Sequence, residues 1–288
     1  MNFATVLSAL LLVSCAIPAP AIQEAADAKE QDYELEENAV VGVRGFAGPI
    51  RVRGWDRKTA RVKTTRSGRD RERLEVKVES TKSELQVSVR HPEDARHLDA
   101  SVEIEVWIPV ALKSLTLKTV SGEITVDDVR AAESRITTVS GAIRAANLKG
   151  DLAATSVSGG ILAKGLAGGR AALTVTSGSI EGSGKLDVLE MTSVSGGATF
   201  DLAPGKDAWS VRASTVNGSI RLTLPAAAGA KVKCTTLSGE IRCDFPMKDK
   251  SGPEKPLVGH VLDGTFGGGT GSIHASTING GVAILQGK

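Results

Sequence analysis

The chain has 288 residues, with 35 Lys and Arg against 33 Asp and Glu and a formal net charge of +2. This near balance disfavours a nucleic-acid-binding protein, because such proteins normally carry a clear basic excess. The composition includes only 3 Trp, 1 Tyr and 5 Phe but 32 Gly. A chain so poor in aromatic residues favours thin layers of β-branched side chains joined by tight turns over an aromatic-cored enzyme domain.

The N-terminus predicts export. Residues 3–13 form an apolar run that is shorter than the roughly 20 residues that span a bilayer, so residues 1–21 indicate an export signal rather than an anchor. Two endings fit the sequence. Cleavage after Ala21 would give a soluble periplasmic protein, whereas a lipobox ending at Cys15 would give a lipoprotein of the outer membrane or cell surface. No later stretch is long and apolar enough to be a transmembrane span.

Three further segments follow the signal. Residues 22–38 are strongly acidic and predict a solvated linker. Residues 39–110 contain runs of alternating polar and apolar residues, which predict a region of plain β-strands, either a β-meander or irregular coils. Residues 111–288 predict an array of β-repeats. The runs expected as plain strands are 60–65, 74–79, 84–90 and 102–109.

The repeat is marked by a Ser-Gly or Asn-Gly pair that occurs eight times. The seven intervals between successive glycines are 19, 18, 19, 18, 22, 21 and 41 residues. A nearly fixed period of this length predicts stacked coils, and the last interval is expected to hold two coils, one of them degenerate. Gly48 fits the same register upstream. The predicted turn glycines are Gly48, Gly122, Gly141, Gly159, Gly178, Gly196, Gly218, Gly239 and Gly280.

The second residue after each glycine is a predicted core position, because it is β-branched in almost every repeat. Alternation on both sides of the turn predicts a strand before it and another after it. Stacking would place like side chains on one another, each buried Ile contributing roughly 1.5–3 kcal/mol. An antiparallel meander with Ser-Gly hairpin loops is the alternative. The expected core ladder is Ile124, Ile143, Ile161, Ile180, Ile220, Ile241 and Val282, with Ala198 in the remaining repeat.

Three segments carry a family resemblance: residues 45–56, the strand ending in Trp107-Ile108-Pro109 with the following Thr-Val-Ser-Gly-Glu-Ile, and residues 267–280. Over roughly residues 38–288 the chain resembles a bacterial envelope family of β-strand-repeat proteins named putative adhesins, a domain of unknown function. The resemblance implies an all-β fold, a right-handed single-stranded β-solenoid (β-helix) similar to autotransporter adhesin heads. With this period each coil would hold about 19–21 residues. The family resemblance implies no catalytic residues for this chain.

The sequence predicts no catalytic, metal or cofactor site. The four histidines, His91, His97, His260 and His274, lack metal-ligand spacing, and the recurrent Ser is a turn residue rather than a nucleophile. The first and third positions after the glycines place no carboxylate pair on adjacent coils, which disfavours a polysaccharide-cleaving solenoid.

Cys234 and Cys243 flank Gly239 in inward-facing positions. Export would place them in an oxidising compartment, so they are candidates for a disulfide; the alternative is two small buried thiols.

The stretch from Arg44 to Lys77 holds twelve basic residues against four acidic ones. It could face an acidic glycan, lipopolysaccharide or anionic headgroups. Alternatively, it fills the solvent face of strands and balances the acidic segment before it.

These observations together predict a non-enzymatic exported envelope protein, an adhesin or scaffold that presents its repeat surface to a glycan, envelope or protein partner. Two alternatives are a carbohydrate-active β-helix enzyme and a self-assembling structural element whose open ends pair edge to edge.

Overall fold

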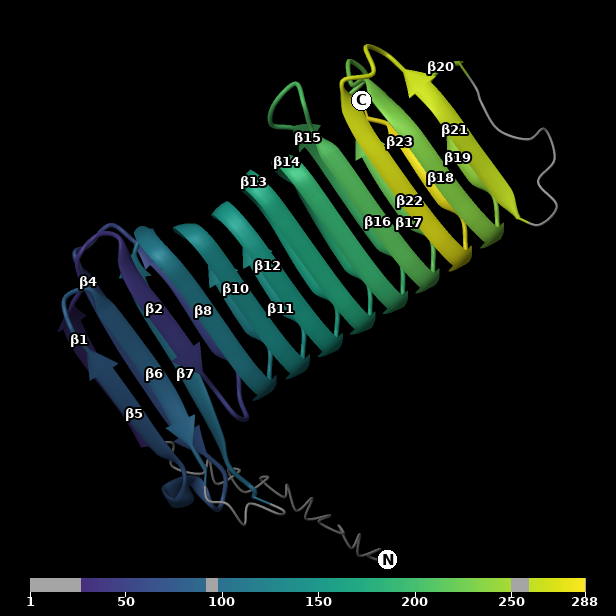
Figure 1. Cartoon of the computed structure of the whole chain (residues 1–288). Helices are drawn as coiled ribbons and strands as arrows, with labels where there is room; N and C mark the ends of the chain where they lie inside the picture. Colours follow the sequence, from purple (N-terminus) through teal and green to yellow (C-terminus); the bar gives the residue numbers. More distant parts are fainter. Residues whose placement is uncertain (1–26, 92–97, 250–258, 288) are drawn as a thin grey trace, which may run out of the picture.

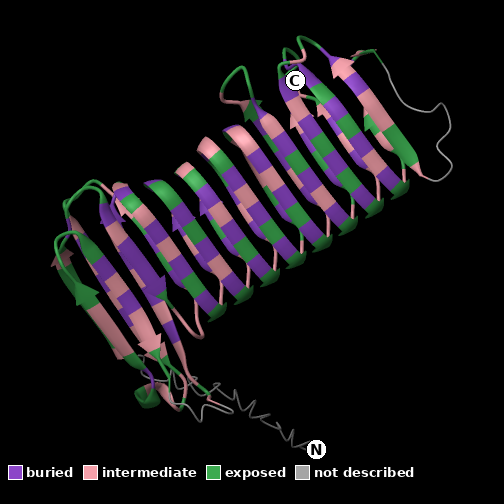
Figure 2. Ribbon diagram, viewed as in Figure 1, coloured by how far each residue is buried: buried purple, intermediate pink, exposed green. Residues whose placement is uncertain are grey.

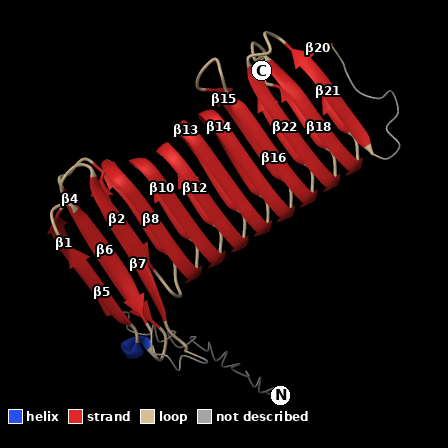
Figure 3. Ribbon diagram, viewed as in Figure 1, coloured by secondary structure: helices blue, strands red, loops and turns tan. Residues whose placement is uncertain are grey.

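The computed structural model describes residues 27–91, 98–249 and 259–287. Their strands form one continuous sheet, and the only helix that interrupts the described residues is a 3₁₀ turn, η1 (Arg71–Arg73) (Figure 3). The export signal with Cys15, and His97, lie outside the described residues. Figure 1 shows the strands stacked side by side along one long axis. The all-β fold class is confirmed.

The strands fall into an N-terminal group, a repeat group and a C-terminal group. The N-terminal group is β1 (Asp27–Glu34), β2 (Ala39–Arg44), β3 (Ile50–Trp55), β4 (Thr59–Ser67), β5 (Glu75–Ser80), β6 (Glu84–Arg90) and β7 (Ser101–Pro109). The repeat group is β8 (Ala111–Ser121), β9 (Ile124–Asp127), β10 (Arg130–Ser140), β11 (Ile143–Ala146), β12 (Lys149–Ser158), β13 (Ile161–Ser177), β14 (Ile180–Ser195), β15 (Ala198–Pro204), β16 (Ser210–Asn217) and β17 (Ile220–Leu224). The C-terminal group is β18 (Ala230–Ser238), β19 (Ile241–Cys243), β20 (Met247–Lys248), β21 (His260–Phe266), β22 (Gly271–Asn279) and β23 (Val282–Gln286).

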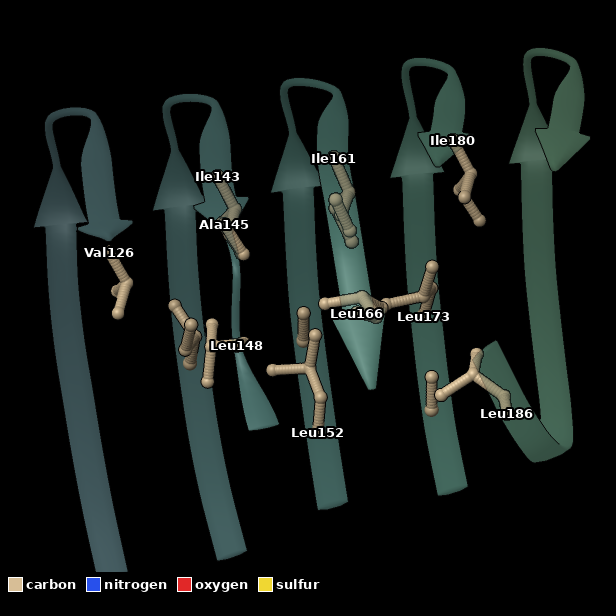
Figure 4. Packing of buried hydrophobic residues seen from close by; sticks show 14 of the residues in the cluster. Val126, Ile143, Ala145, Leu148, Leu152, Ile161, Leu166, Leu173, Ile180 and Leu186 are labelled. Carbon is tan, nitrogen blue, oxygen red and sulfur yellow. The ribbon is translucent and has the colours of Figure 1, made fainter. Parts of the chain in front are cut away.

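Each coil contributes one strand before its Ser-Gly corner and one after it, and we call the two resulting layers the first face and the second face. Equivalent strands pair in parallel and in register: Ile143 pairs with Ile124 on one side and with Ile161 on the other. All three side chains are buried. Figure 4 shows Ile143, Ile161 and Ile180 at equivalent places in successive coils. The predicted ladder is therefore confirmed in register, with every member buried except Ile241, which is half-buried on the outermost coil, and the antiparallel hairpin alternative is wrong for the repeats.

A hydrogen bond from a side-chain hydroxyl to a backbone carbonyl links most corners to the neighbouring coil. In six of the eight coils a buried Ser or Thr, three residues before the turn glycine, donates to the glycine carbonyl of the neighbouring coil. Examples are Ser156 Oγ to Gly141 O at 3.1 Å and Thr215 Oγ1 to Gly196 O at 3.1 Å. Because the backbone groups at a buried turn need partners, this Ser/Thr column explains the Thr- and Ser-rich repeat.

At the C-terminus the spatial order departs from chain order. The last coil, β22 with β23, lies between the coil β16–β17 and the coil β18–β19. The chain returns to that slot through β21, which runs antiparallel to β18. The expected degenerate coil in the 41-residue interval is therefore wrong. Instead, β21 covers an edge of β18 that would otherwise be open to pairing.

The N-terminal end is permuted in the same way. The coil β2–β3 packs against β8 and β9, and β6 and β7 lie outside it. The predicted strands β4 to β7 are confirmed, with β4 antiparallel to β7 and β5 antiparallel to β6. Since β2 pairs with β8, no break in the sheet separates residues 39–110 from the repeats.

The acidic segment is not wholly a linker. Its residues Asp27–Glu34 form β1, which pairs antiparallel with the basic strand β4. Opposite charges across the pair hold the strand in register, so the sequence's acidic character serves pairing rather than solvation.

One continuous aliphatic core fills the space between the two faces, and Figure 2 shows buried and exposed positions alternating along the strands. Aromatic residues close its C-terminal end, where Phe245 stacks on Phe266 with ring centroids 4.3 Å apart. The near absence of aromatics elsewhere in the core follows from the thinness of each coil, which leaves room for a β-branched side chain but rarely for a ring.

Candidate binding surface

Four residues of the basic stretch, Arg51, Arg53, Arg61 and Lys63, point outward from β3 and β4 of the second face, and carboxylates neutralise three of them. Arg61 contacts Glu30 at 3.1 Å and Asp32 at 2.7 Å, and Lys63 contacts Glu105 at 2.8 Å. The hydrogen bond from Arg61 lowers the pKa of the Asp32 carboxyl, and the bond to Glu105 raises the pKa of Lys63. Further pairs are Arg51–Glu103, Arg66–Asp27, Arg69–Asp99 and Lys77–Glu79. The interpretation that the basic stretch balances the acidic segment before it is confirmed for Arg61 and Arg66, whereas the other pairs use carboxylates from later in the chain.

An aromatic side chain lies at the centre of this surface. Trp107 points outward from β7, since its neighbours Val106 and Ile108 are buried. The strand register places Arg61 of β4 beside it on one side and Arg53 of β3 on the other. Cross-strand neighbours of this kind have Cα atoms about 5 Å apart, within reach of their side chains.

These three side chains form a row across neighbouring strands, and a carboxylate lies at each end of the row. Asp32 lies next to Arg61 in the register, and Asp127 lies next to Arg53. Only the Arg61 end is closed by an ion pair; Arg53 is exposed and makes no ion pair with any residue that the structure describes. The guanidinium of Arg53 therefore remains available for an external anion beside Trp107.

A second tryptophan lies on the same side of the sheet. Trp55, the last residue of β3, donates from Nε1 to the carbonyl of Thr59 at 2.7 Å. The Arg57 guanidinium lies 4.8 Å from its ring centroid and that of Arg61 lies 5.5 Å away. Two of the chain's three tryptophans thus gather with three arginines, whereas the third, Trp209, is buried.

Two hollows border this cluster, which we call the Trp107 surface (Arg53, Trp55, Arg57, Arg61 and Trp107). One, of about 230 Å³, is lined by Arg51, Val52, Arg53, Glu105, Val106, Trp107, Thr125 and Asp127. The other, of about 380 Å³, is lined by Glu37, Trp55, Asp56, Arg57, Lys58, Pro109, Val110, Ala111 and Arg130. Each is large enough for a group the size of a sugar ring.

Sequence reasoning placed Arg53, Arg57 and Arg61 in a candidate basic stretch but assigned no binding role to Trp55 or Trp107. A signal for Trp107 was present, because it occupies the polar phase of the alternation Val102, Ile104, Val106, Ile108. A tryptophan in that phase is on the outside of the sheet.

The described residues contain no cluster of three or more His, Cys, Asp or Glu arranged to hold a metal ion. His91 lies against Phe46, with ring centroids 4.2 Å apart. No helix within the described ranges has the length and apolarity to cross a membrane.

No disulfide joins Cys234 and Cys243 in the structure, which favours the alternative of two separate thiols over the candidate disulfide. They lie in strands of opposite faces, β18 and β19. Cys243 Sγ lies 3.8 Å from Met247 Sδ and 3.9 Å from the carbonyl oxygen of Phe245. Burial, with the neighbouring Cys243, raises the pKa of the Cys234 thiol to about 12.

We therefore expect Cys234 and Cys243 to be found as separate thiols. Trypsin cleaves after Arg242, so alkylation after unfolding should give two unlinked modified peptides by mass spectrometry. In the native protein at pH 8 Cys234 should react very slowly, because a raised pKa keeps the thiol protonated. A linked pair of peptides from protein isolated without reductant would contradict this assignment.

The fold has solved counterparts. A structure named as a putative adhesin from Parabacteroides distasonis ATCC 8503 is 11% identical, with a TM-score of 0.50 over 90% of this chain and 97% of that chain. Another from the same organism, named as a putative lipid binding protein, is 16% identical, with a TM-score of 0.47 over 91% and 97% of the two chains. A putative adhesin from Bacteroides fragilis NCTC 9343 is 12% identical, with a TM-score of 0.41 over 90% and 97%. At these identities the likeness concerns the fold alone.

No curated protein matches the chain. The family match is to Toastrack DUF4097 over residues 36–204, which is more than half of the 288 residues. This segment contains the Trp107 surface and the coils from β2–β3 to β14–β15. The chain belongs to the Toastrack DUF4097 family.

Proposed function

We propose that this protein is a non-enzymatic, exported envelope protein of the adhesin or scaffold type, whose coils wind as a right-handed β-solenoid and which binds an acidic glycan on the Trp107 surface. The right-handed winding is supported by the parallel pairing of successive coils, since crossovers between parallel strands are almost always right-handed. The apolar run before Cys15 supports export.

The observation that carries the proposal is the exposed Arg53 beside Trp107. An indole ring offers an apolar face on which the CH groups of a sugar ring can lie, and a guanidinium offers two parallel donors to a carboxylate. A uronic acid presents both groups at about the spacing of two neighbouring strands. Both side chains line the hollow of about 230 Å³ next to Trp107, which supports the binding of a sugar ring there.

The rest of the cluster fits an extended chain. Arg57, Lys58 and Arg130 line the second hollow beyond Trp55, and the described residues hold no ion pair for any of them. A polysaccharide that crosses from one hollow to the other would meet a positive group at each end. Repetition of such weak contacts raises avidity without requiring a deep pocket.

We expect Trp107→Ala to weaken binding to polygalacturonate by about tenfold or more, which corresponds to about 1.4 kcal/mol. Arg53→Gln should weaken binding to polygalacturonate but not to a neutral polysaccharide, and 0.5 M NaCl should reduce the wild-type affinity because exposed charge pairs are screened. Affinity is measured by calorimetry or glycan-coated biolayer sensors.

Arg221→Gln is the matched control, because Arg221 is exposed on the outward side of the same face several coils away. Its affinity should equal that of the wild type. Equal affinity of wild type and Trp107→Ala would overturn the proposal. Steady release of reducing ends from the polysaccharide would favour the alternative of a carbohydrate-active enzyme.

A further inference from the structure

A second surface runs along the corner of the coils and is independent of the Trp107 surface. Two residues before the turn glycine, seven of eight coils carry an exposed aliphatic side chain. They are Val120, Val139, Val157, Val194, Val216 and Ile278, with Leu237 on the outermost coil; their exposed fractions range from 37% to 51%. Thr176 fills the same position in the remaining coil. We call this row the corner stripe. Figure 2 shows exposed positions repeated at the same end of successive first-face strands.

The stripe is straight because the coils are in register. Thr119 pairs with Thr138 and Ser121 with Ser140, so Val120 and Val139 are adjacent. The inserted coil fits the same row, because Thr277 and Asn279 of β22 pair with Thr215 and Asn217 of β16. With about 4.8 Å between strands, eight coils give a row about 34 Å long.

The columns beside the stripe are almost uncharged. One residue before each glycine is always Ser or Asn, and all of these are exposed. Four residues before it the column is Thr or Ser, with Lys118 as the one exception. In the next column out, half of the coils carry a charged side chain: Arg135, Glu190, Arg212 and Lys233. The stripe is therefore an apolar row within a neutral hydroxyl border.

We propose that the corner stripe is the interface of a homodimer, in which a second copy of this chain lies antiparallel along it. An apolar row of this length, interrupted only at Thr176, is unusual on a monomer and marks an interaction site. A two-fold axis makes the same patch complementary to itself.

The regular spacing of the side chains along the corner stripe favours a second copy of this chain as the partner. Aliphatic side chains that project every 4.8 Å or so can interdigitate fully only with a row of the same period, as in tightly packed sheet-to-sheet interfaces. A second copy has that period along its whole length. Lys118 is the one charged residue in the two border columns, so the border lacks the clusters of Lys and Arg that hold a protein on an anionic lipid surface.

The extent of the surface agrees with a stable dimer. Three columns over eight coils give 24 positions on each copy, within the roughly 20–30 residues per side of a standard interface of about 800 Å². Hydroxyl groups in the two border columns can pair across the interface or hold bridging water.

The test uses the full chain in analytical ultracentrifugation from about 1 to 100 µM, compared with Val157→Lys/Val194→Lys. The wild type should sediment as a dimer at the upper concentrations, and the double variant should be a monomer throughout, because each Lys would place a charge in the apolar row opposite a second copy. Both sites are already half exposed, so the fold should be retained, which circular dichroism and an unchanged Tm would show.

Leu162→Lys is the matched control. Leu162 follows the same corner as Val157, but it points outward from the second face and lies outside the corner stripe. This variant should dimerise like the wild type. A wild type that is monomeric at every concentration, or dimers that persist in the double variant, would overturn the proposal. Flotation of monomeric wild type with zwitterionic lipid vesicles, lost in Val157→Lys/Val194→Lys, would assign the stripe to a lipid surface instead and equally overturn it.

Discussion

Ile143→Asp should destabilise the coil stack by more than any other single side-chain change we consider. Ile143 is fully buried, with Ile124 and Ile161 stacked on either side of it. Loss of its volume alone costs about 2–5 kcal/mol. The buried carboxylate adds a further penalty, because none of the stacked neighbours can donate a hydrogen bond to it. We expect a cooperative loss of the coils around β11, seen as a lower Tm and as faster amide exchange in β9 and β13.

Thr125→Asp is the matched control for this change. Thr125 lies on the adjacent coil and points outward, between Arg51 and Arg144 in the register. The same new carboxylate there meets water and two guanidinium groups, so stability should change by less than about 1 kcal/mol. If Ile143→Asp melts at the temperature of Thr125→Asp, the inward direction of the Ile column is wrong.

The coil register could be predicted from sequence because it depends on local signals that repeat. Every coil places a glycine at the corner, and all but one place a β-branched residue two positions later, so the repeated local signals reinforce one another. The hydroxyl three positions before the glycine is part of the same rule. The sequence shows it as a Thr/Ser column, but its partner, a carbonyl of the next coil, becomes visible only when the coils are stacked.

The two ends could not be predicted, because their pairing is not periodic. Nothing in residues 260–266 indicates that this strand runs antiparallel to β18, or that β22 then enters between two earlier coils. Asp27–Glu34 has the composition of a solvated linker, and only the basic strand β4 opposite makes it a strand. In both places long-range pairing outweighs local propensity.

The candidate binding surface could likewise be predicted only in part from the sequence. The basic residues are visible in the sequence as a run, but their availability is not: Arg61 and Lys63 are paired, and Arg53 is not. The difference arises because the acidic strand β1 lies beside β4, whereas β3 lies beside β9. Likewise, the alternation that buries Leu115, Leu117 and Thr119 turns Val120 outward, but the alignment of such side chains into one row follows only from the pairing of the coils.

Gly141→Ala should destabilise the protein by about 2 kcal/mol or more although it adds a single methyl group. Gly141 has a φ of +150°, where L-residues are rarely found. An ideal Cβ built on it lies 2.1 Å from the carbonyl oxygen of Gly122 in the preceding coil. That oxygen belongs to the backbone and also accepts from Thr138 Oγ1 at 3.4 Å, so it cannot withdraw without opening the corner. The coil spacing would have to widen locally, against the backbone hydrogen bonds on both sides.

Gly268→Ala provides the comparison, because an ideal Cβ at Gly268 meets nothing within 4 Å. Its melting temperature should stay within about 1 °C of the wild type, since substitutions at open surface positions change stability little. Chemical denaturation of the two variants measures the difference directly. Equal stability of Gly141→Ala and Gly268→Ala would mean that close approach of carbonyl and Cα does not set the coil spacing. In that case the glycine column would reflect flexibility of the chain at the corner rather than contact between coils.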